Sequence, residues 1–188
     1  MQTPDKIILG IDPGTVVMGY GIIAIAGKSA RIIDMGVLKL GQKKDAYHRL
    51  ELIHLKIKEL IDKYSPHSFA IESPFFGKNI QSMLKLGRAQ GVAIATAMSA
   101  GLQVTEYSPK KIKLSITGNG NADKEQIWKM LQHLLQLQDK PKFFDATDAL
   151  AVALCHFYEA RSALPFMKKN KSSWEDFVKQ NRERVKQF

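Results

Sequence analysis

Cysteine is nearly absent from this 188-residue chain, which contains only Cys155. A single cysteine excludes an intrachain disulfide and a zinc cluster built from cysteines, and it fits a reducing compartment. Long hydrophobic runs are missing as well, since the longest, around residues 21–26, is far shorter than the roughly 20 residues of a membrane-spanning helix. The N-terminus also lacks the basic and then apolar pattern of a signal peptide. We therefore expect a cytoplasmic protein with no membrane partner.

Acidic residues are scarce relative to basic ones. The chain has 18 Asp and Glu against 28 Lys and Arg, which gives a net charge of +10 and a pI near 9.6. This balance favours a polyanionic partner, although charge also serves simple solubility. Half of the excess belongs to residues 161–188, where eight basic and three acidic residues give +5. We expect residues 1–160 to form one domain and residues 161–188 to form a basic C-terminal tail with a short helix.

Hydrophobic periodicity predicts an α/β fold with a mixed five-stranded sheet flanked by helices. Three strands come first, then helices and strands alternate, and two helices close the domain. Short links between the first three strands indicate an antiparallel meander. The expected strands cover residues 6–12, 18–25, 30–40, 68–72 and 102–106, and the expected helices cover residues 45–63, 80–100, 122–138 and 145–160.

Two helices carry residues that need interpretation. In the helix over 80–100, Gly87, Gly91 and Ala95 are four residues apart and form a stripe that allows close approach of a sheet or of another helix. In the last helix, Cys155 and His156 lie among Ala, Leu and Phe. We expect the cysteine in the core and the histidine at the surface.

Four carboxylates lie in otherwise apolar surroundings: Asp12, Glu72, Asp145 and Asp148. A carboxylate at the edge of a core is costly unless a cation neutralises it. Asp12 and Glu72 end the first and fourth strands, and a parallel pairing of these strands would place both at the carboxyl edge of the sheet. Asp145 and Asp148 are three residues apart, on one face of a helix. Such oxygen ligands favour Mg²⁺ or Mn²⁺ over zinc, in a site where two ions lie roughly 3.5–4 Å apart.

Three of these carboxylates also have an ordinary structural explanation. Asp12 precedes Pro13 and Gly14 and is a good turn former. Asp145 is a natural helix N-cap, and Asp148 would be a first-turn acid favoured by the helix dipole. Glu72 has no such explanation, because the end of an apolar strand does not require a carboxylate. The combination favours one metal site.

Five segments, in order along residues 6–160, resemble the RuvC family of bacterial Holliday junction resolvases. They are Ile8–Thr15 continuing through Gly19–Ile23, Ile71–Asn79, Leu86–Gly91, Gly118–Lys124 and Asp145–Ala151. The resemblance implies an RNase H-like fold and a homodimer that nicks two opposed strands of four-way junction DNA at symmetric positions, in recombination and DNA repair. It also implies Mg²⁺ as cofactor, with two ions per subunit and Mn²⁺ as a substitute, and products with 5′-phosphate and 3′-hydroxyl ends.

The same resemblance assigns roles to individual residues. The four carboxylates match the family's catalytic metal ligands, and Lys113 and Lys124 match basic residues near the scissile phosphate, Lys124 with a catalytic role. Phe75 matches an aromatic residue at the junction centre, and the helix over 80–100 matches the dimer interface. Plain surface lysines and a core phenylalanine are the ordinary alternatives. The DNA-binding candidates are Phe75, Lys78, Asn79, Lys113 and Lys124.

Other functions share parts of this pattern. Residues 12–15 followed by Gly19 and Gly21 also resemble the phosphate-binding hairpin of sugar kinases and actin-like ATPases, although one such lobe does not make a nucleotide cleft. A non-catalytic junction- or RNA-binding module would keep the fold, but it would not need all four carboxylates. An RNase H-like nuclease acting on RNA would differ in substrate alone. The tail leaves open a contact with a branch-migration motor.

Overall fold

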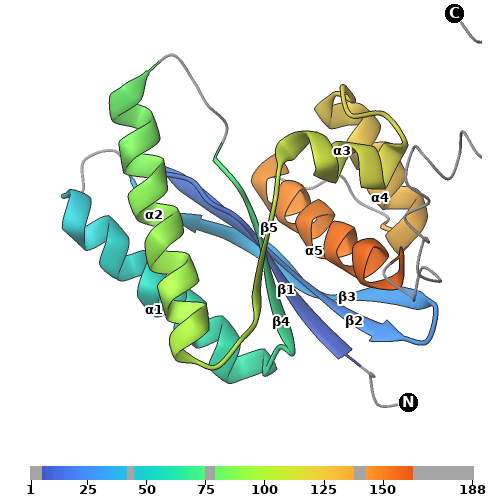
Figure 1. Ribbon diagram of the computed structural model, residues 1–188, viewed down its shortest axis with the longest axis horizontal. Coiled ribbons are helices and arrows are strands. Elements are labelled where there is room, and N and C mark those ends of the chain that lie inside the picture. The colour runs from blue at the N-terminus through green and yellow to red at the C-terminus, as the bar shows by residue number, and fades with distance from the viewer. Residues whose placement is uncertain (1–5, 42–44, 75–78, 138–142, 163–188) are drawn as a thin grey trace, which may run out of the picture. The chain divides into compact units, whose positions relative to one another are not determined.

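The computed structural model describes residues 6–41, 45–74, 79–137 and 143–162 (Figure 1). Contacts between Cα atoms group the chain into the units Met1–Tyr158 and Glu159–Phe188. All five strands belong to the first unit. Only residues 159–162 of the second unit are described, so the predicted tail helix and any contact with a motor lie outside the described residues.

The strands form a mixed five-stranded sheet in the order β3-β2-β1-β4-β5, as predicted. β1 is antiparallel to β2, and β2 to β3, whereas β1–β4 and β4–β5 are parallel pairs. Ile11 of β1 is in register with Ile71 of β4, so the next residue of each strand, Asp12 and Glu72, reaches the same edge of the sheet. The strands are β1 (Lys6–Asp12), β2 (Val17–Ala26), β3 (Ser29–Lys39), β4 (Ser68–Glu72) and β5 (Val104–Tyr107).

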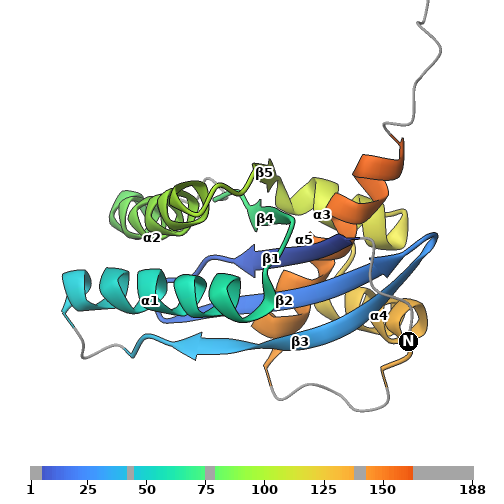
Figure 2. The same cartoon turned by 90° about the horizontal axis from the view of Figure 1, so that it is seen from below.

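Helices cover both faces of the sheet (Figures 1 and 2). Successive side chains of β1 point to opposite faces of the sheet, so Ile8 packs against one helix layer and Leu9 against the other. The helices α1 (Ala46–Tyr64) and α2 (Ile80–Ser99) lie on the Leu9 face, and α3 (Pro109–Thr117), α4 (Lys124–Leu135) and α5 (Phe144–Ser162) lie on the Ile8 face. Within the described ranges, no helix is both long and apolar enough to cross a bilayer.

Helix α3 was not predicted, and the pattern of two closing helices is therefore wrong. The helix has nine residues and buries only Ile112 and Ile116, too few positions for a clear helical period. Local capping defines its ends instead. The Ser108 hydroxyl accepts a hydrogen bond from the Lys111 backbone N–H, and Gly118 ends the helix at a φ of 74°.

The last helix corrects a second expectation. Cys155 is buried as predicted, but His156 is buried too, with 9% of its surface exposed. The histidine is not a surface residue, because α5 is covered along much of its length and contributes buried residues at nearly every position from Ala146 to Phe157.

Candidate functional site

Asp12 and Glu72 project from the face of the sheet that α5 covers. Side chains alternate along a strand, and Ile8 of β1 and Ala70 of β4 both belong to the apolar cluster that contains α5. Asp12 lies four residues after Ile8, and Glu72 lies two residues after Ala70, so both have the same orientation. The two carboxylates therefore face the helix that carries Asp145 and Asp148.

Glycines allow α5 to rest directly on β1 and β2. A Cβ atom added to Gly10 would lie 2.7 Å from the Ala153 backbone nitrogen, and one added to Gly21 would lie 2.8 Å from the Leu150 nitrogen. Both separations are shorter than real Cβ contacts, so only glycine fits. This close approach carries the first turns of α5 to the carboxyl end of β1, where Asp12 lies.

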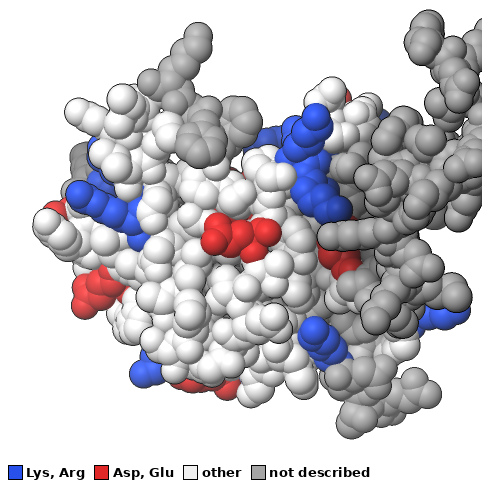
Figure 3. Space-filling model, in the orientation of Figure 1, with Lys and Arg blue, Asp and Glu red and all other residues white. Residues whose placement is uncertain are grey.

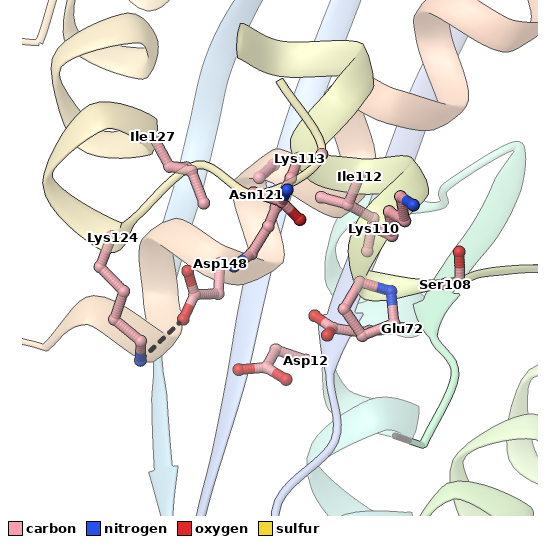
Figure 4. Close-up of a pocket in the computed structure, with 13 residues that line it drawn as sticks. Asp12, Glu72, Ser108, Lys110, Ile112, Lys113, Asn121, Lys124, Ile127 and Asp148 are labelled. Atoms are coloured by element: carbon pink, nitrogen blue, oxygen red, sulfur yellow. Dashed lines mark ion pairs between the residues drawn. The ribbon is translucent and has the colours of Figure 1, made fainter. Parts of the chain in front are cut away.

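The side chains meet in a pocket of about 660 Å³ at this edge of the sheet (Figure 4). In Figure 4, carboxylates from β1, β4 and α5 approach a common space, and lysines approach from α3 and α4. Five of the residues predicted from the sequence line it: Asp12, Glu72, Asp148, Lys113 and Lys124. The structure thus brings together residues from five separate elements.

Asp145 does not line the pocket but interacts electrostatically with Asp12, Asp148 and Lys124. The N-cap interpretation of this residue is wrong, because α5 already begins at Phe144 and places Asp145 within its first turn. A first-turn acid remains favourable to the helix dipole, so the residue also has a structural role.

Of the DNA-binding candidates after Glu72, Asn79 does not line the pocket. Asn79 is the N-cap of α2, and its side-chain oxygen accepts a hydrogen bond from the Ser82 backbone N–H at 3.0 Å. Phe75 and Lys78 lie outside the described residues. Asn79 therefore has a clear structural task at the start of α2.

Burial and mutual repulsion make the carboxylates of Asp12 and Glu72 hard to ionise. Burial raises the pKa of Asp12 from 3.8 to about 8, and repulsion from Glu72, Asp148 and Asp145 adds to it against a smaller effect of Lys124. Burial likewise raises the pKa of Glu72 from 4.5 to about 7, with Lys113 and Lys124 opposing the shift. At neutral pH the Asp12 carboxyl is therefore mostly protonated and that of Glu72 about half protonated, and a nearby cation favours the charged form of both.

Lys124 is paired with one of these carboxylates. Its ammonium nitrogen lies 3.3 Å from an oxygen of Asp148, and this attraction raises the pKa of the lysine. Burial nevertheless outweighs the lysine and raises the pKa of Asp148. Lys124 is itself well exposed, so its ammonium group remains accessible to an anion entering the pocket.

The carboxylate oxygens at this site are the ligand type that a hard divalent ion prefers. Within the described part of the chain, no group of three His, Cys, Asp or Glu residues is arranged closely enough to hold a metal ion. The pKa values of Asp12 and Glu72 are raised first by burial and then by repulsion from neighbouring carboxylates, and a divalent cation among them would relieve both effects. Carboxylate oxygens alone suit Mg²⁺ or Mn²⁺.

Sequence reasoning missed three polar residues of the pocket: Ser108, Lys110 and Asn121. Two of them depend on α3, which was not predicted, and Asn121 lies in the connection from α3 to α4. The Ser108–Pro109 pair was a usable signal, since serine before proline is typical of a helix start. Figure 3 shows basic side chains gathered over α3 on the same face of the molecule as acidic ones.

Comparison with known proteins places these features in a family. The family model "Crossover junction endodeoxyribonuclease RuvC" matches residues 8–156. RuvC of Bacteroides fragilis is 52% identical over 184 residues, covering 97% of both chains. RuvC of Christiangramia forsetii is 53% identical over 182 residues, covering 97% of this chain and 94% of that one. Thermus thermophilus RuvC, solved with a Holliday junction, is 33% identical and has a TM-score of 0.79 over 84% of this chain and 96% of that chain.

Proposed function

The chain belongs to the RuvC family of crossover junction endodeoxyribonucleases, and we propose that Asp12, Glu72, Asp145 and Asp148 hold the metal ions on which its nuclease chemistry depends. The protein resolves four-way DNA junctions on an RNase H-like fold. Junction resolution replaces the three alternatives that the sequence left open, which are an ATPase, a non-catalytic binding module and an RNA nuclease.

One observation carries the metal proposal. Asp12, Glu72 and Asp148 come from three elements, yet they line one pocket, and two of them have pKa values raised to about 7 and 8. When bound, two Mg²⁺ ions, or Mn²⁺ in their place, would supply a water of lowered pKa and stabilise the departing 3′-oxygen. Asp12 would release its proton as it becomes a ligand, and Asp145 would complete the set from the first turn of α5.

The two lysines have separate tasks in this proposal. Lys124 contacts Asp148 and remains exposed, so it is placed to offset charge on the phosphate that enters the pocket. Lys113, on α3, lines the same pocket, and its charge opposes the rise in the pKa of Glu72. Cleavage with this arrangement would leave 5′-phosphate and 3′-hydroxyl ends.

We further propose that α2 joins two copies of the chain. The stripe of Gly87, Gly91 and Ala95 does not pack on its own sheet, because all three residues are exposed. Nothing lies within 4 Å of a Cβ atom added to either glycine. Leu84 and Met98, at 61% and 62% exposure, extend this apolar face. A second α2 would cover it, and two subunits would account for two opposed nicks.

The substitution Asp12→Asn tests the metal site. The variant keeps the shape of the side chain but loses the charge, so we expect nicking of a synthetic four-way junction to fall by orders of magnitude while junction binding is retained. Asp62→Asn, on the exposed side of α1, is the matched control and should nick normally. The assay includes three-way and linear duplex DNA, each with and without Mg²⁺. Undiminished nicking by Asp12→Asn would contradict the assignment.

A further inference from the structure

Tyr107 and His156 form a polar contact inside the apolar layer between the sheet and α5. The Tyr107 hydroxyl and His156 Nδ1 are 2.9 Å apart, and the rings meet edge to face with centroids 5.9 Å apart. Burial, with a contribution from Lys6, lowers the pKa of His156, so the ring is neutral at physiological pH. A neutral imidazole and a phenol each satisfy the polar atom of the other.

Tyr107 is also attached to the strand end that carries Glu72. In the parallel pair of β4 and β5, Tyr107 is in register with Glu72, and the two side chains project from the same face of the sheet. Its backbone carbonyl accepts hydrogen bonds from the Ser73 N–H at 2.9 Å and the Ser73 hydroxyl at 3.2 Å. Tyr107 is thus the strand neighbour of Glu72 and is bonded to the residue that follows it.

His156 lies on the helix that carries Asp148. The two residues are eight positions apart, which corresponds to roughly 12 Å along a helix axis. Towards its N-terminus, α5 packs against the glycines of β1 and β2. The contact with Tyr107 therefore adds a polar attachment of α5 to β5, on the side of the sheet where Glu72 lies.

We propose that the hydrogen bond between Tyr107 and His156 positions Glu72 relative to Asp148, and so sets how tightly the pocket binds divalent metal. Neither residue lines the pocket, so both are positioning residues and not catalytic ones. The inference rests on the proposed metal site. Its alternative is a polar pair that stabilises the core without affecting the pocket.

Two variants remove the bond, and a third keeps a polar atom in place. Tyr107→Phe removes the hydroxyl alone, and His156→Leu removes the ring nitrogens. His156→Asn retains a polar atom bonded to Cγ, where Nδ1 stands in histidine. Manganese affinity is measured by titration calorimetry on the full-length protein, and the half-saturating Mn²⁺ concentration is measured for nicking of a four-way junction. Melting temperature in EDTA reports the effect on stability.

We expect Tyr107→Phe and His156→Leu to weaken Mn²⁺ binding by roughly threefold to tenfold, which reaches only the low end of the roughly 10- to 100-fold that removing an outer partner of a metal ligand costs. His156→Asn should recover most of the affinity. Wild-type Mn²⁺ affinity in Tyr107→Phe, with only a lower melting temperature, would overturn the positioning role and leave the metal site standing. Absence of Mn²⁺ binding by the wild-type protein would overturn both. If Tyr107→Phe does not fold, the comparison of His156→Leu with His156→Asn decides.

Discussion

The backbone of Asp145 lies directly against Gly19, with no room for a methyl group between α5 and β2. Gly19→Ala would therefore push the first turn of α5 away from the sheet. We expect the free energy of unfolding to fall by about 1–3 kcal/mol, as for other overpacked sites. Nicking should fall by roughly 100-fold, because a displacement of about 1 Å misplaces the carboxylates. Chemical denaturation and a junction-nicking assay measure the two effects.

Gly36→Ala is the matched control for this change. A Cβ atom on Gly36 would meet the outer end of the Tyr20 side chain, 2.5 Å from its hydroxyl and 3.0 Å from a ring carbon, and not the backbone of α5. The same methyl group on β3 should therefore leave nicking nearly unchanged. Normal nicking by Gly19→Ala would show that the position of α5 on β2 does not matter for the reaction.

The strands and their carboxylates were predictable because the evidence for them is local. Apolar runs ending at Asp12 and Glu72 predict buried strands, and the parallel pairing of β1 with β4 then brings the two acids to one edge. The spacing of Asp145 and Asp148 likewise follows from the helical repeat. Metal-ligand candidates at element ends could therefore be named without a structure.

The rest of the site depends on contacts that a sequence does not display. Lys110 and Asn121 reach the pocket only because the short helix α3 turns back beside it. The burial of His156 depends on where α5 crosses the sheet, and its partner Tyr107 is 49 residues away. Protonation is equally non-local, since the raised pKa of Asp12 reflects burial and carboxylates from three other positions.

Removal of the Asp12 charge should stabilise the metal-free protein. The folded chain holds protons on Asp12 and Glu72 up to pH values of about 8 and 7, whereas the unfolded chain releases them near 3.8 and 4.5. Since the folded state binds more protons in this range, its stability falls as pH rises from about 4 to 8. In EDTA at about pH 8, Asp12→Asn should be more stable than wild type by about 1–3 kcal/mol.

Thermal unfolding at a series of pH values checks this sign. The advantage of Asp12→Asn should grow from acid to neutral pH and level off above the raised pKa of Asp12. Asp62→Asn should follow the wild-type curve. Added Mg²⁺ should stabilise the wild type far more than Asp12→Asn, because it binds the folded state. If Asp12→Asn is less stable than wild type at high pH, the ionised Asp12 carboxylate does not destabilise the metal-free fold.

Substitution of Lys124 should impair chemistry more than binding. Lys124→Ala removes the ammonium group that contacts Asp148, and we expect nicking under single-turnover conditions to fall by roughly 100- to 1,000-fold, as when a group that stabilises transition-state charge is lost. Lys129→Ala, one turn further along α4, removes an exposed lysine paired with Glu125 and is the control. Equal nicking rates for the two variants would show that Lys124 is an ordinary surface lysine with no role in the reaction.

The exposed face of α2 predicts a dimer that a single charge disrupts. Gly91→Glu adds a carboxylate where the isolated chain has open space, so the monomer should fold normally. We expect light scattering to report a monomer, and nicks on the two opposed strands should no longer be coupled. Leu134→Glu, which changes an exposed leucine on α4, should remain dimeric. A dimer of unchanged affinity in Gly91→Glu would exclude this face.

Junction binding should depend steeply on salt, because phosphate contacts release counterions. Lys113 lines the pocket beside Glu72 and is a candidate for one such contact. In EDTA, which prevents nicking, Lys113→Ala should weaken binding and reduce the slope of log affinity against log salt by about one between roughly 50 and 200 mM. Lys58→Ala, on the exposed side of α1 and the opposite face of the sheet, controls for the loss of one positive charge. If both variants reduce the slope equally, the contribution of Lys113 is a general field effect of charge and not a phosphate contact at the pocket.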